Sequence, residues 1–254
     1  MNIAVITGAS SGIGKEICFA IQDRIPAVEE FWLFSRRKDE LQKIANQLFC
    51  PTRIFSYDLT EKEGIEEYRS ALTKDKPSIL FLVNAAGFGK LGETEKLSES
   101  EQLKMIDLNC KALTAFTVYS LPFMRRKSRI IQIASAAAFL PQREFSVYAA
   151  TKSYVYSFSL SLREELRERE IGVTAVCPGP VDTEFFKVAG NEGKLRFAKS
   201  FFMAKPKKVA MQALMDSVLK RPVSVYGFSM KLFYAMSRVI PDFILIKFLR
   251  KFYT

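Results

Sequence analysis

A glycine-rich turn between an apolar strand and a helix restricts the fold of this chain more than any other feature. The apolar residues 2–6 lead directly into Thr7-Gly8-Ala9-Ser10-Ser11-Gly12-Ile13-Gly14, and apolar residues then recur at helical spacing. In such a unit, glycines let backbone amides and the helix N-terminus approach a pyrophosphate closely. The spacing Gly-x3-Gly-x-Gly differs from the commonest dinucleotide fingerprint, so an ordinary glycine turn is the alternative.

Strand-like and helix-like segments alternate along most of the chain. Further strands are predicted at 31–35, 53–57, 79–83, 129–135, 172–176 and 223–226, and helices at 61–73, 99–126, from about 146 to about 170, and at 206–220. Such alternation predicts an α/β protein with a doubly wound parallel sheet of about seven strands and helices on both faces. We find no internal repeat or linker, so residues 1–254 are expected to form one domain.

The composition excludes several kinds of chemistry. The 254 residues include no histidine, which excludes Ser-His-Asp hydrolysis and the usual histidine-containing metal sites. Cys18, Cys50, Cys110 and Cys177 lack C-x-x-C spacing, so we expect reduced thiols, no disulfide framework and no metal. The first residues carry no signal-peptide pattern, and a cytoplasmic location is the expectation.

The net charge of +11 is unevenly distributed. Residues 1–186 carry equal numbers of basic and acidic side chains, 24 of each, whereas residues 187–254 carry 14 basic and 3 acidic ones. This asymmetry favours an anionic membrane surface or an anionic substrate as a partner, ahead of nucleic acid, which we do not expect.

A tyrosine and a lysine lie four residues apart at the start of the predicted helix that begins near residue 146. Positions i and i+4 share a helix face, so Tyr148 and Lys152 can serve one site. An ammonium about 4 Å from a phenol favours the phenolate by up to roughly 4 kcal/mol, which would lower the pKa of Tyr148 toward neutrality. Taken alone, however, a chance pair on a surface helix is the simpler interpretation.

The segment after the second strand is basic. In a dinucleotide-binding sheet this position faces the adenosine ribose, and here Ser35, Arg36 and Arg37 stand where an acidic residue would select NAD. Because arginine binds phosphate bidentately, the residues favour NADP(H) over NAD(H). Basic residues that only solvate the start of a helix are the alternative.

Six sequence blocks together resemble the short-chain dehydrogenase/reductase family, in its branch of about 250 residues. They are Thr7–Gly14, Asn84-Ala85-Ala86-Gly87, Asn109, Ser135, Tyr148-x3-Lys152 and Pro178-Gly179-Pro180-Val181-Asp182-Thr183, and they span residues 3–185. The resemblance implies a Rossmann-type fold and a nicotinamide-dependent oxidoreductase of ketones and secondary alcohols. It replaces the chance-pair interpretation of Tyr148 and Lys152.

The family resemblance also implies a role for each residue of the candidate catalytic set Asn109, Ser135, Tyr148 and Lys152. Tyr148 would transfer the proton, Lys152 would lower the pKa of Tyr148 and bind the nicotinamide ribose, and Ser135 would hydrogen-bond the substrate oxygen. Asn109 would hold a helix distortion and a water molecule that links Lys152 to solvent. None of these roles needs histidine.

The cofactor contacts implied by the family resemblance come from several strand ends, and two departures limit the comparison. The contacts are Gly8, Ser10, Ser11, Gly12, Ile13, Gly14, Ser35, Arg36, Arg37, Asp58, Leu59, Asn84, Ala85, Ala86, Tyr148, Lys152, Pro178, Gly179, Val181 and Thr183. Asp58 would contact the adenine, and Val181 and Thr183 the carboxamide. Ser11 stands where NADP-dependent members often have a basic residue, and Asn84-Ala85-Ala86-Gly87 replaces the commoner Asn-Asn-Ala-Gly.

A phenylalanine-rich segment follows the last block. Residues 182–205 are expected to form a substrate lid, and with Phe88, Phe139, Leu140 and Phe145 they favour a bulky apolar substrate such as a steroid, a bile acid or a long acyl ketone. Mutual packing of these aromatic rings is the alternative. A 3-oxoacyl thioester is the second candidate substrate, and a non-catalytic nucleotide-binding protein is the third functional class.

The last 27 residues are amphipathic and basic. Pro241-Asp242 is expected to divide residues 228–254 into two short helices, and no apolar run reaches the ~18 residues of a membrane span. This extension could anchor the chain on a membrane surface, pack in a homo-oligomer or cover the active site. The expected partners are a small carbonyl or alcohol substrate and further copies of the chain, in a homodimer or homotetramer.

Overall fold

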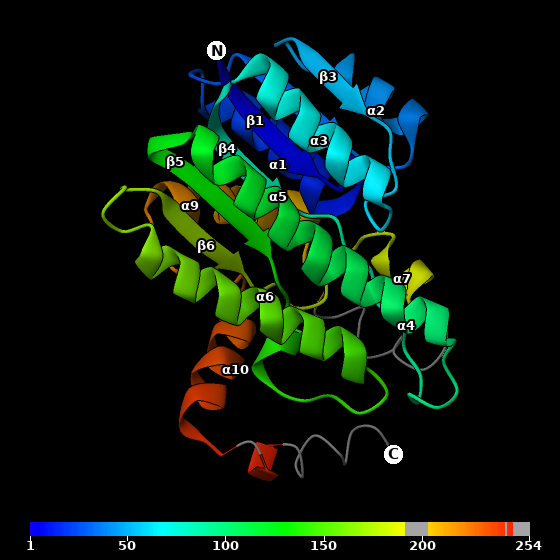
Figure 1. Cartoon of the computed structure of the whole chain (residues 1–254). Helices are drawn as coiled ribbons and strands as arrows, with labels where there is room; N and C mark the ends of the chain where they lie inside the picture. Colours follow the sequence, from blue (N-terminus) through cyan, green and yellow to red (C-terminus); the bar gives the residue numbers. More distant parts are fainter. Residues whose placement is uncertain (191–202, 242, 246–254) are drawn as a thin grey trace.

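A single parallel sheet of seven strands forms the centre of the molecule (Figure 1). The computed structural model describes residues 1–190, 203–241 and 243–245. In sequence order the strands are β1 Asn2–Thr7, β2 Glu30–Phe34, β3 Thr52–Phe55, β4 Ser78–Asn84, β5 Met124–Ile133, β6 Gly172–Val176 and β7 Val223–Ser224. Their order across the sheet is β3-β2-β1-β4-β5-β6-β7, which confirms the predicted doubly wound α/β class.

Helices cover both faces of the sheet. One face is packed against α1 Gly12–Arg24, α2 Lys38–Ala45 and α9 Pro206–Val218, and the other against α3 Lys62–Asp75, α5 Leu113–Ser120 and α6 Ser146–Glu165. Alternate residues of β1 belong to the two layers, because successive side chains of a strand point to opposite faces. Ala4 and Ile6 lie in the first core cluster, and Ile3 and Val5 in the second.

The long helix predicted for 99–126 is interrupted. It consists of α4 Glu99–Ile106, a π-helical turn at Asp107–Ala112, α5 and a 3₁₀ turn at Leu121–Phe123, and β5 already begins at Met124. Pro122 lies at the start of the 3₁₀ turn, where its missing N–H costs nothing. The boundary prediction was wrong because the chain enters the sheet at Met124, five residues before the start of the predicted strand 129–135.

Helix α6 is shorter than the predicted helix that extends to about Glu170. The chain leaves helical geometry at Leu166, and Glu170 takes a left-handed φ of 54° before β6 begins at Gly172. The backbone N–H of Ile171 donates to the carbonyl oxygen of Leu166 and closes this turn. The Arg- and Glu-rich residues that the prediction assigned to the end of this helix therefore extend beyond it.

Besides α9, helices α7 and α10 follow the last sequence block in the part of the chain that the structure describes. Helix α7 comprises Phe185–Val188, and α10 comprises Phe228–Val239, which follows β7 and lies beyond the carboxyl ends of the strands (Figure 1). Half of the predicted lid, residues 191–202, lies outside the described residues, and this half includes Lys194, Arg196 and Lys199. Asp242 and residues 246–254 also lie outside them. No helix within the described ranges is both long and apolar enough to cross a membrane.

Candidate active site

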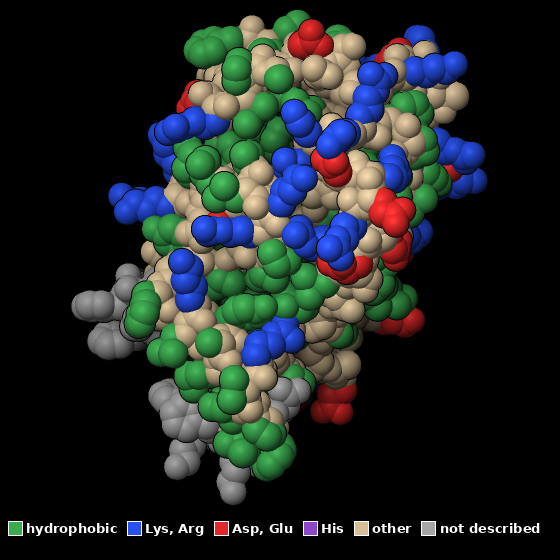
Figure 2. Space-filling view, turned by 90° about the vertical axis from the view of Figure 1, so that its left-hand side faces the viewer, with side chains coloured by type: hydrophobic (Ala, Val, Ile, Leu, Met, Phe, Trp, Pro, Cys, Tyr) green, Lys and Arg blue, Asp and Glu red, His purple; other side chains and the backbone are tan. Residues whose placement is uncertain are grey.

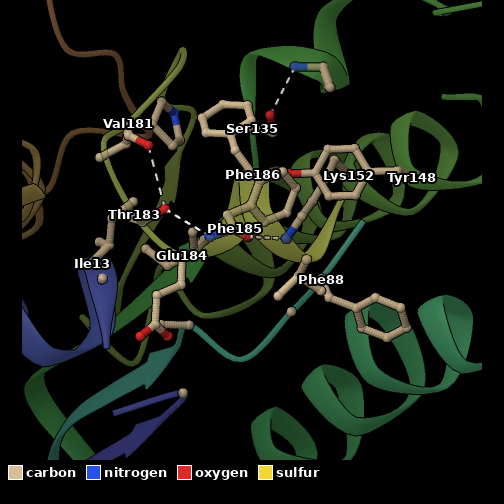
Figure 3. Close-up of a pocket in the computed structure, with 18 of the residues that line it drawn as sticks. Ile13, Phe88, Ser135, Tyr148, Lys152, Val181, Thr183, Glu184, Phe185 and Phe186 are labelled. Carbon is tan, nitrogen blue, oxygen red and sulfur yellow. Dashed lines mark hydrogen bonds between the residues drawn. The ribbon is translucent and has the colours of Figure 1, made fainter. Parts of the chain in front are cut away.

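A cleft of about 540 Å³ opens at the carboxyl ends of β1, β4, β5 and β6 (Figure 3). This is where the strand order reverses, the usual ligand position in open parallel sheets. The predicted residues that line it are Gly8, Ser11, Gly12, Ile13, Gly14, Arg36, Arg37, Ala85, Ala86, Ser135, Tyr148, Lys152, Pro178, Gly179, Val181 and Thr183. The tertiary structure therefore brings most of the predicted site residues together.

The glycine turn holds the end of β1 tightly against the end of β4. Gly8 has a left-handed φ of 66°, and a Cβ atom there would lie 2.6 Å from the backbone nitrogen of Ala86. The Thr7 hydroxyl oxygen accepts hydrogen bonds from the N–H groups of Ala85 and Ala86, both at 3.1 Å. The first glycine is thus required by close packing within the protein, a reason that the sequence prediction did not consider.

The N-terminus of α1 faces the cleft through Ser11, Gly12, Ile13 and Gly14. No side chain caps this helix end, and its first turn contains no acidic residue. Exposed N–H groups and the positive end of the helix dipole bind anions well. This part of the cleft therefore fits the pyrophosphate of a dinucleotide.

Tyr148 lies in the first turn of α6, with only 6% of its surface exposed. The ring of Phe145 stacks on it at a centroid distance of 4.3 Å, and the ring of Phe185 lies 5.3 Å away. Burial raises the pKa of Tyr148 to about 12, against an opposing hydrogen-bonding contribution from Ser135. The predicted lowering of this pKa toward neutrality was wrong, because desolvation of the phenolate outweighs the hydrogen bond from Ser135.

Lys152 lies one turn further along α6 and points into the same cleft (Figure 3). Its Nζ donates a hydrogen bond to the carbonyl oxygen of Ile133 at 2.8 Å and lies 5.7 Å from the centroid of the Tyr148 ring. Burial lowers the pKa of Lys152 to about 8. The ammonium is therefore close to the phenol, but the surrounding protein destabilises its charge.

Ser135 lies two residues after the end of β5 and reaches the cleft beside Tyr148 (Figure 3). Its extended backbone ends the strand, and its hydroxyl oxygen accepts a hydrogen bond from the N–H of Ala137 at 3.1 Å, which caps the 3₁₀ turn Ala136–Phe139. This cap fixes the orientation of the hydroxyl oxygen at the floor of the cleft.

Asn109 lies behind the cleft, inside the π-helical turn, with no exposed surface. Its amide nitrogen donates to the Phe88 carbonyl oxygen at 2.9 Å and to the Thr151 hydroxyl at 3.0 Å, and its oxygen accepts from the Phe88 N–H at 3.1 Å. Asn109 therefore joins the loop after β4 to α6, next to Lys152. A distortion of the helix at this residue agrees with the prediction.

Arg36 and Arg37 line the outer end of the cleft but already have partners. The guanidinium of Arg37 donates to the Ser10 hydroxyl at 3.0 and 3.2 Å and forms an ion pair with Glu184 at 2.9 Å. Arg36 is 3.6 Å from the Asp58 carboxylate. Burial acts to raise the pKa of Asp58, but hydrogen bonds from Thr60 and the charge of Arg36 outweigh it and lower the pKa.

Several predicted contacts do not line the cleft. Asn84 is buried, and its amide donates to Thr117 and Gln132, so it joins β4 to α5 and β5 rather than facing a ligand. Leu59 is 4% exposed and packs in the core. Several predicted residues do not line the cleft but form hydrogen bonds with neighbouring residues of the chain. They are Ser10, Ser35, Asp58, Asn84 and Asn109.

The cleft also has polar walls that sequence reasoning missed. Gln142 and Arg143 come from the loop before α6, and Glu184 follows Thr183 directly. Glu184 lies one residue beyond a recognised block, which was its only signal in the sequence. Gln142 and Arg143 carried no spacing signal, because their position depends on how that loop folds over the cleft.

The C-terminal extension packs beside the cleft. The phenol oxygens of Tyr234, in α10, and Tyr156, in α6, are 3.1 Å apart, and the guanidinium of Arg238 lies over both rings. A Cβ atom at Gly179 would collide with the side chain of Met230 in α10. One face of α10 therefore borders the cleft wall without closing it.

Comparisons with known proteins agree with this geometry. Residues 2–193 match the short chain dehydrogenase family. An uncharacterized oxidoreductase of Staphylococcus epidermidis is 33% identical over 184 residues, 72% of this chain and 79% of the relative. The chain therefore belongs to the short-chain dehydrogenase family and is an oxidoreductase that acts on alcohol and ketone groups. Within the described residues, no cluster of acidic or cysteine side chains could hold a metal ion.

Two solved structures share this architecture over nearly the whole chain. A short-chain dehydrogenase from Sphingobium yanoikuyae in complex with NADPH is 25% identical, with a TM-score of 0.78 and 91% of each chain covered. The closed form of serine dehydrogenase complexed with NADP+ is 30% identical, with a TM-score of 0.76, covering 89% of this chain and 94% of the other.

Proposed function

We propose that this chain is an NADP(H)-dependent oxidoreductase that interconverts a bulky apolar ketone and the corresponding secondary alcohol, with Tyr148 as the general acid and base. One observation carries the proposal most directly. A protonated phenol, a buried lysine and a fixed serine hydroxyl meet in one cleft, beside an uncapped helix N-terminus.

Carbonyl reduction requires a hydride at carbon, a proton at oxygen and stabilisation of the negative charge that develops on that oxygen. A bound nicotinamide cofactor supplies the hydride chemistry. Tyr148 holds its proton across the neutral range, because its pKa is raised to about 12, so its phenol is ready to donate. Ser135 donates a second hydrogen bond to the same oxygen, and Lys152 supplies a positive charge near the phenol as its proton leaves.

The cofactor would be held by three features of the chain. The turn Ser11–Gly14 with the N-terminus of α1 would bind the pyrophosphate, and the loop that carries Val181 and Thr183 would hold the carboxamide. Arg36 and Arg37 at the end of β2 would bind a 2′-phosphate, which is why we propose NADP(H). The two structural relatives described above carry NADPH and NADP+, which supports the choice.

The inner wall of the cleft favours an apolar substrate. Phe88, Phe145, Phe185, Phe186 and Val188 line it around Tyr148 (Figure 3). Part of this aromatic surface is used internally, since Phe145 and Phe185 pack on Tyr148 itself. The exposed remainder suits a rigid apolar body with one carbonyl group, of the hydroxysteroid or bile-acid kind.

The proposal is tested by a substrate screen that follows NADPH oxidation with steroid ketones, bile-acid ketones and 3-oxoacyl thioesters. We expect turnover with the first two classes and a loss of about 10² to 10⁴ in turnover for Tyr148→Phe, because one general acid contributes about that factor. Tyr154→Phe is the matched control, since its hydroxyl lies on the same helix, is exposed and bonds to Thr114.

Either of two results would contradict the proposal. Turnover of the ketone substrates by Tyr148→Phe at the wild-type rate would remove Tyr148 as the acid. Turnover of acyl thioesters alone would replace the substrate class but keep the chemistry.

A further inference from the structure

The outward face of α10 is an exposed apolar stripe. Phe228, Leu232, Met236 and Val239 follow one another at helical spacing and are 84%, 52%, 37% and 83% exposed. Phe243 and Ile244 extend the apolar surface beyond the helix, at 72% and 47% exposure. Figure 2 shows apolar side chains gathered on the lower part of this side of the molecule. Contiguous exposed patches of this kind usually mark an interaction surface.

The stripe is exposed although α10 is firmly docked. The opposite side of the helix contributes Met230, Phe233 and Tyr234 to a core cluster with Phe139 and Tyr156. The contacts of Arg238 with the Tyr156 and Tyr234 rings add to this attachment. Because these contacts use the inward face, the stripe cannot turn into the protein.

The charge around the stripe decides between possible partners. Across residues 203–241 and 243–245, Asp216 is the only carboxylate, and it is buried and paired with Arg221 and Ser224. Exposed basic residues of the same segment include Lys207, Lys208, Lys220 and Lys231. A second copy docked on this face would bring like charges together, whereas an anionic lipid surface attracts them.

We propose that α10 lies on the surface of an anionic lipid membrane, with the apolar stripe in the interfacial layer and Lys231, which α10 itself carries, at the lipid phosphates. Binding of this kind depends on the buried apolar area and on attraction to anionic lipids together. It requires no spanning helix. The contact between Met230 and Gly179 places the edge of the cleft next to the lipid-facing helix. The proposal does not depend on the identity of the substrate.

Vesicle sedimentation of the full-length chain tests this proposal. Vesicles of phosphatidylcholine alone are compared with vesicles of equal parts phosphatidylcholine and phosphatidylglycerol. We expect sedimentation with the anionic vesicles and a roughly tenfold weaker partition for Leu232→Ser/Val239→Ser, because two apolar side chains are removed from the lipid contact. The partition should also weaken as salt rises from 50 to 500 mM.

Phe49→Ser is the matched control, since Phe49 is 88% exposed and lies at Leu48–Cys50, before β3 rather than in α10. It should bind vesicles like the wild type. Fluorescence of Trp32, buried in the sheet, reports whether each variant is folded.

Two outcomes would overturn the proposal. One is equal partition of the wild type and of Leu232→Ser/Val239→Ser, including no partition by either. The other is a wild-type dimer in sedimentation velocity that the double substitution converts to a monomer without affecting vesicles, which would make the stripe a subunit interface.

Discussion

At the scale of single residues, Tyr148 and Lys152 each disfavour their charged form. The pKa of Tyr148 is raised to about 12 and that of Lys152 is lowered to about 8, both chiefly by burial. A neutral phenol holds the proton to be donated, and the ammonium of Lys152 then stands close to the phenolate that is left, so each buried charge partly offsets the other. The same burial makes the site costly for the fold.

Replacement of Lys152 by methionine should change stability in a pH-dependent way. Between about pH 8 and 10.5 the unfolded chain binds more protons at Lys152 than the folded chain does, so the wild type gains stability as pH rises. Methionine does not titrate, so the free energy of unfolding of Lys152→Met, measured relative to that of the wild type, should fall by about 2 to 3 kcal/mol between pH 7 and pH 10. Urea unfolding at a series of pH values measures this difference.

The effect of Tyr148 cancels in that comparison, because both proteins retain it. Parallel stability curves for the two proteins would show that Lys152 does not titrate in this range.

In the proposed NADP(H) complex, Glu184 would compete with the 2′-phosphate for Arg37. Its carboxylate pairs with the guanidinium at 2.9 Å on a partly exposed surface, so its removal should free Arg37 and reduce repulsion of the phosphate. We expect Glu184→Gln to tighten NADPH binding about two- to fivefold with little effect on NADH, and Arg36→Ala/Arg37→Ala to weaken NADPH binding far more than NADH binding. Equilibrium binding followed by nucleotide fluorescence measures both.

Glu66→Gln is the control, since Glu66 pairs with Arg69 on α3. Equal changes for NADPH and NADH in the Glu184 and arginine variants would mean that these residues do not read the 2′-phosphate.

At the scale of elements, the π-helical turn Asp107–Ala112 connects the loop after β4 to the helix that carries the reactive pair. The extra residue in this turn directs Asn109 inward, where it satisfies both backbone groups of Phe88 and the Thr151 hydroxyl. π-Helical turns often mark functional sites, because they disturb the regular hydrogen-bond ladder at a position that side chains then occupy.

Asn109→Ala should destabilise the fold and impair the site together. It leaves the partly buried Phe88 N–H and carbonyl unpaired, at a cost of about 2 to 4 kcal/mol in the free energy of unfolding. Urea unfolding gives the first quantity, and turnover at a temperature where the variant stays folded gives the second.

Lys111→Ala changes an exposed residue of the same turn, paired only with Asp107, and should alter stability by less than about 0.5 kcal/mol. A similar loss of stability in both variants would mean that the turn, and not the Asn109 contacts, matters.

At the scale of the whole molecule, the two faces of the sheet have different cores. One is mainly aliphatic, and the other contains an aromatic cluster in which Phe116 stacks on Tyr68 at 4.2 Å and meets Phe34 edge-on at 4.9 Å. Trp32 is the only tryptophan of the chain and lies in the same layer, so it reports directly on this core. The site depends on both layers, because each fixes the ends of the strands.

Phe116→Ala should therefore lower the free energy of unfolding by about 3 to 5 kcal/mol, through lost burial and the cavity left behind. Trp32 fluorescence during urea unfolding measures it. Phe49→Ala, at an exposed phenylalanine, should change stability by less than about 0.5 kcal/mol. A loss below 1 kcal/mol for Phe116→Ala would show that the aromatic layer can collapse around the gap.

The sequence by itself determined the order of strands and helices along the chain, the family, the enzyme class and most of the predicted residues that meet at the cleft. Apolar periodicity and the glycine turn were sufficient for the fold, because these patterns depend on local geometry. The catalytic roles of Asn109, Ser135, Tyr148 and Lys152 stay predictions, as do the cytoplasmic location and a homodimer or homotetramer.

The tertiary structure alone decided properties that depend on neighbours distant in sequence. Burial raised the pKa of Tyr148 where the spacing of Tyr148 and Lys152 had predicted a lower one, and packing turned Asn84 away from the cleft. The ion pair between Arg37 and Glu184 and the outward stripe of α10 likewise arise from the packing of distant segments. Desolvation and side-chain contact are set by the three-dimensional surroundings, and one-dimensional spacing contains no measure of either.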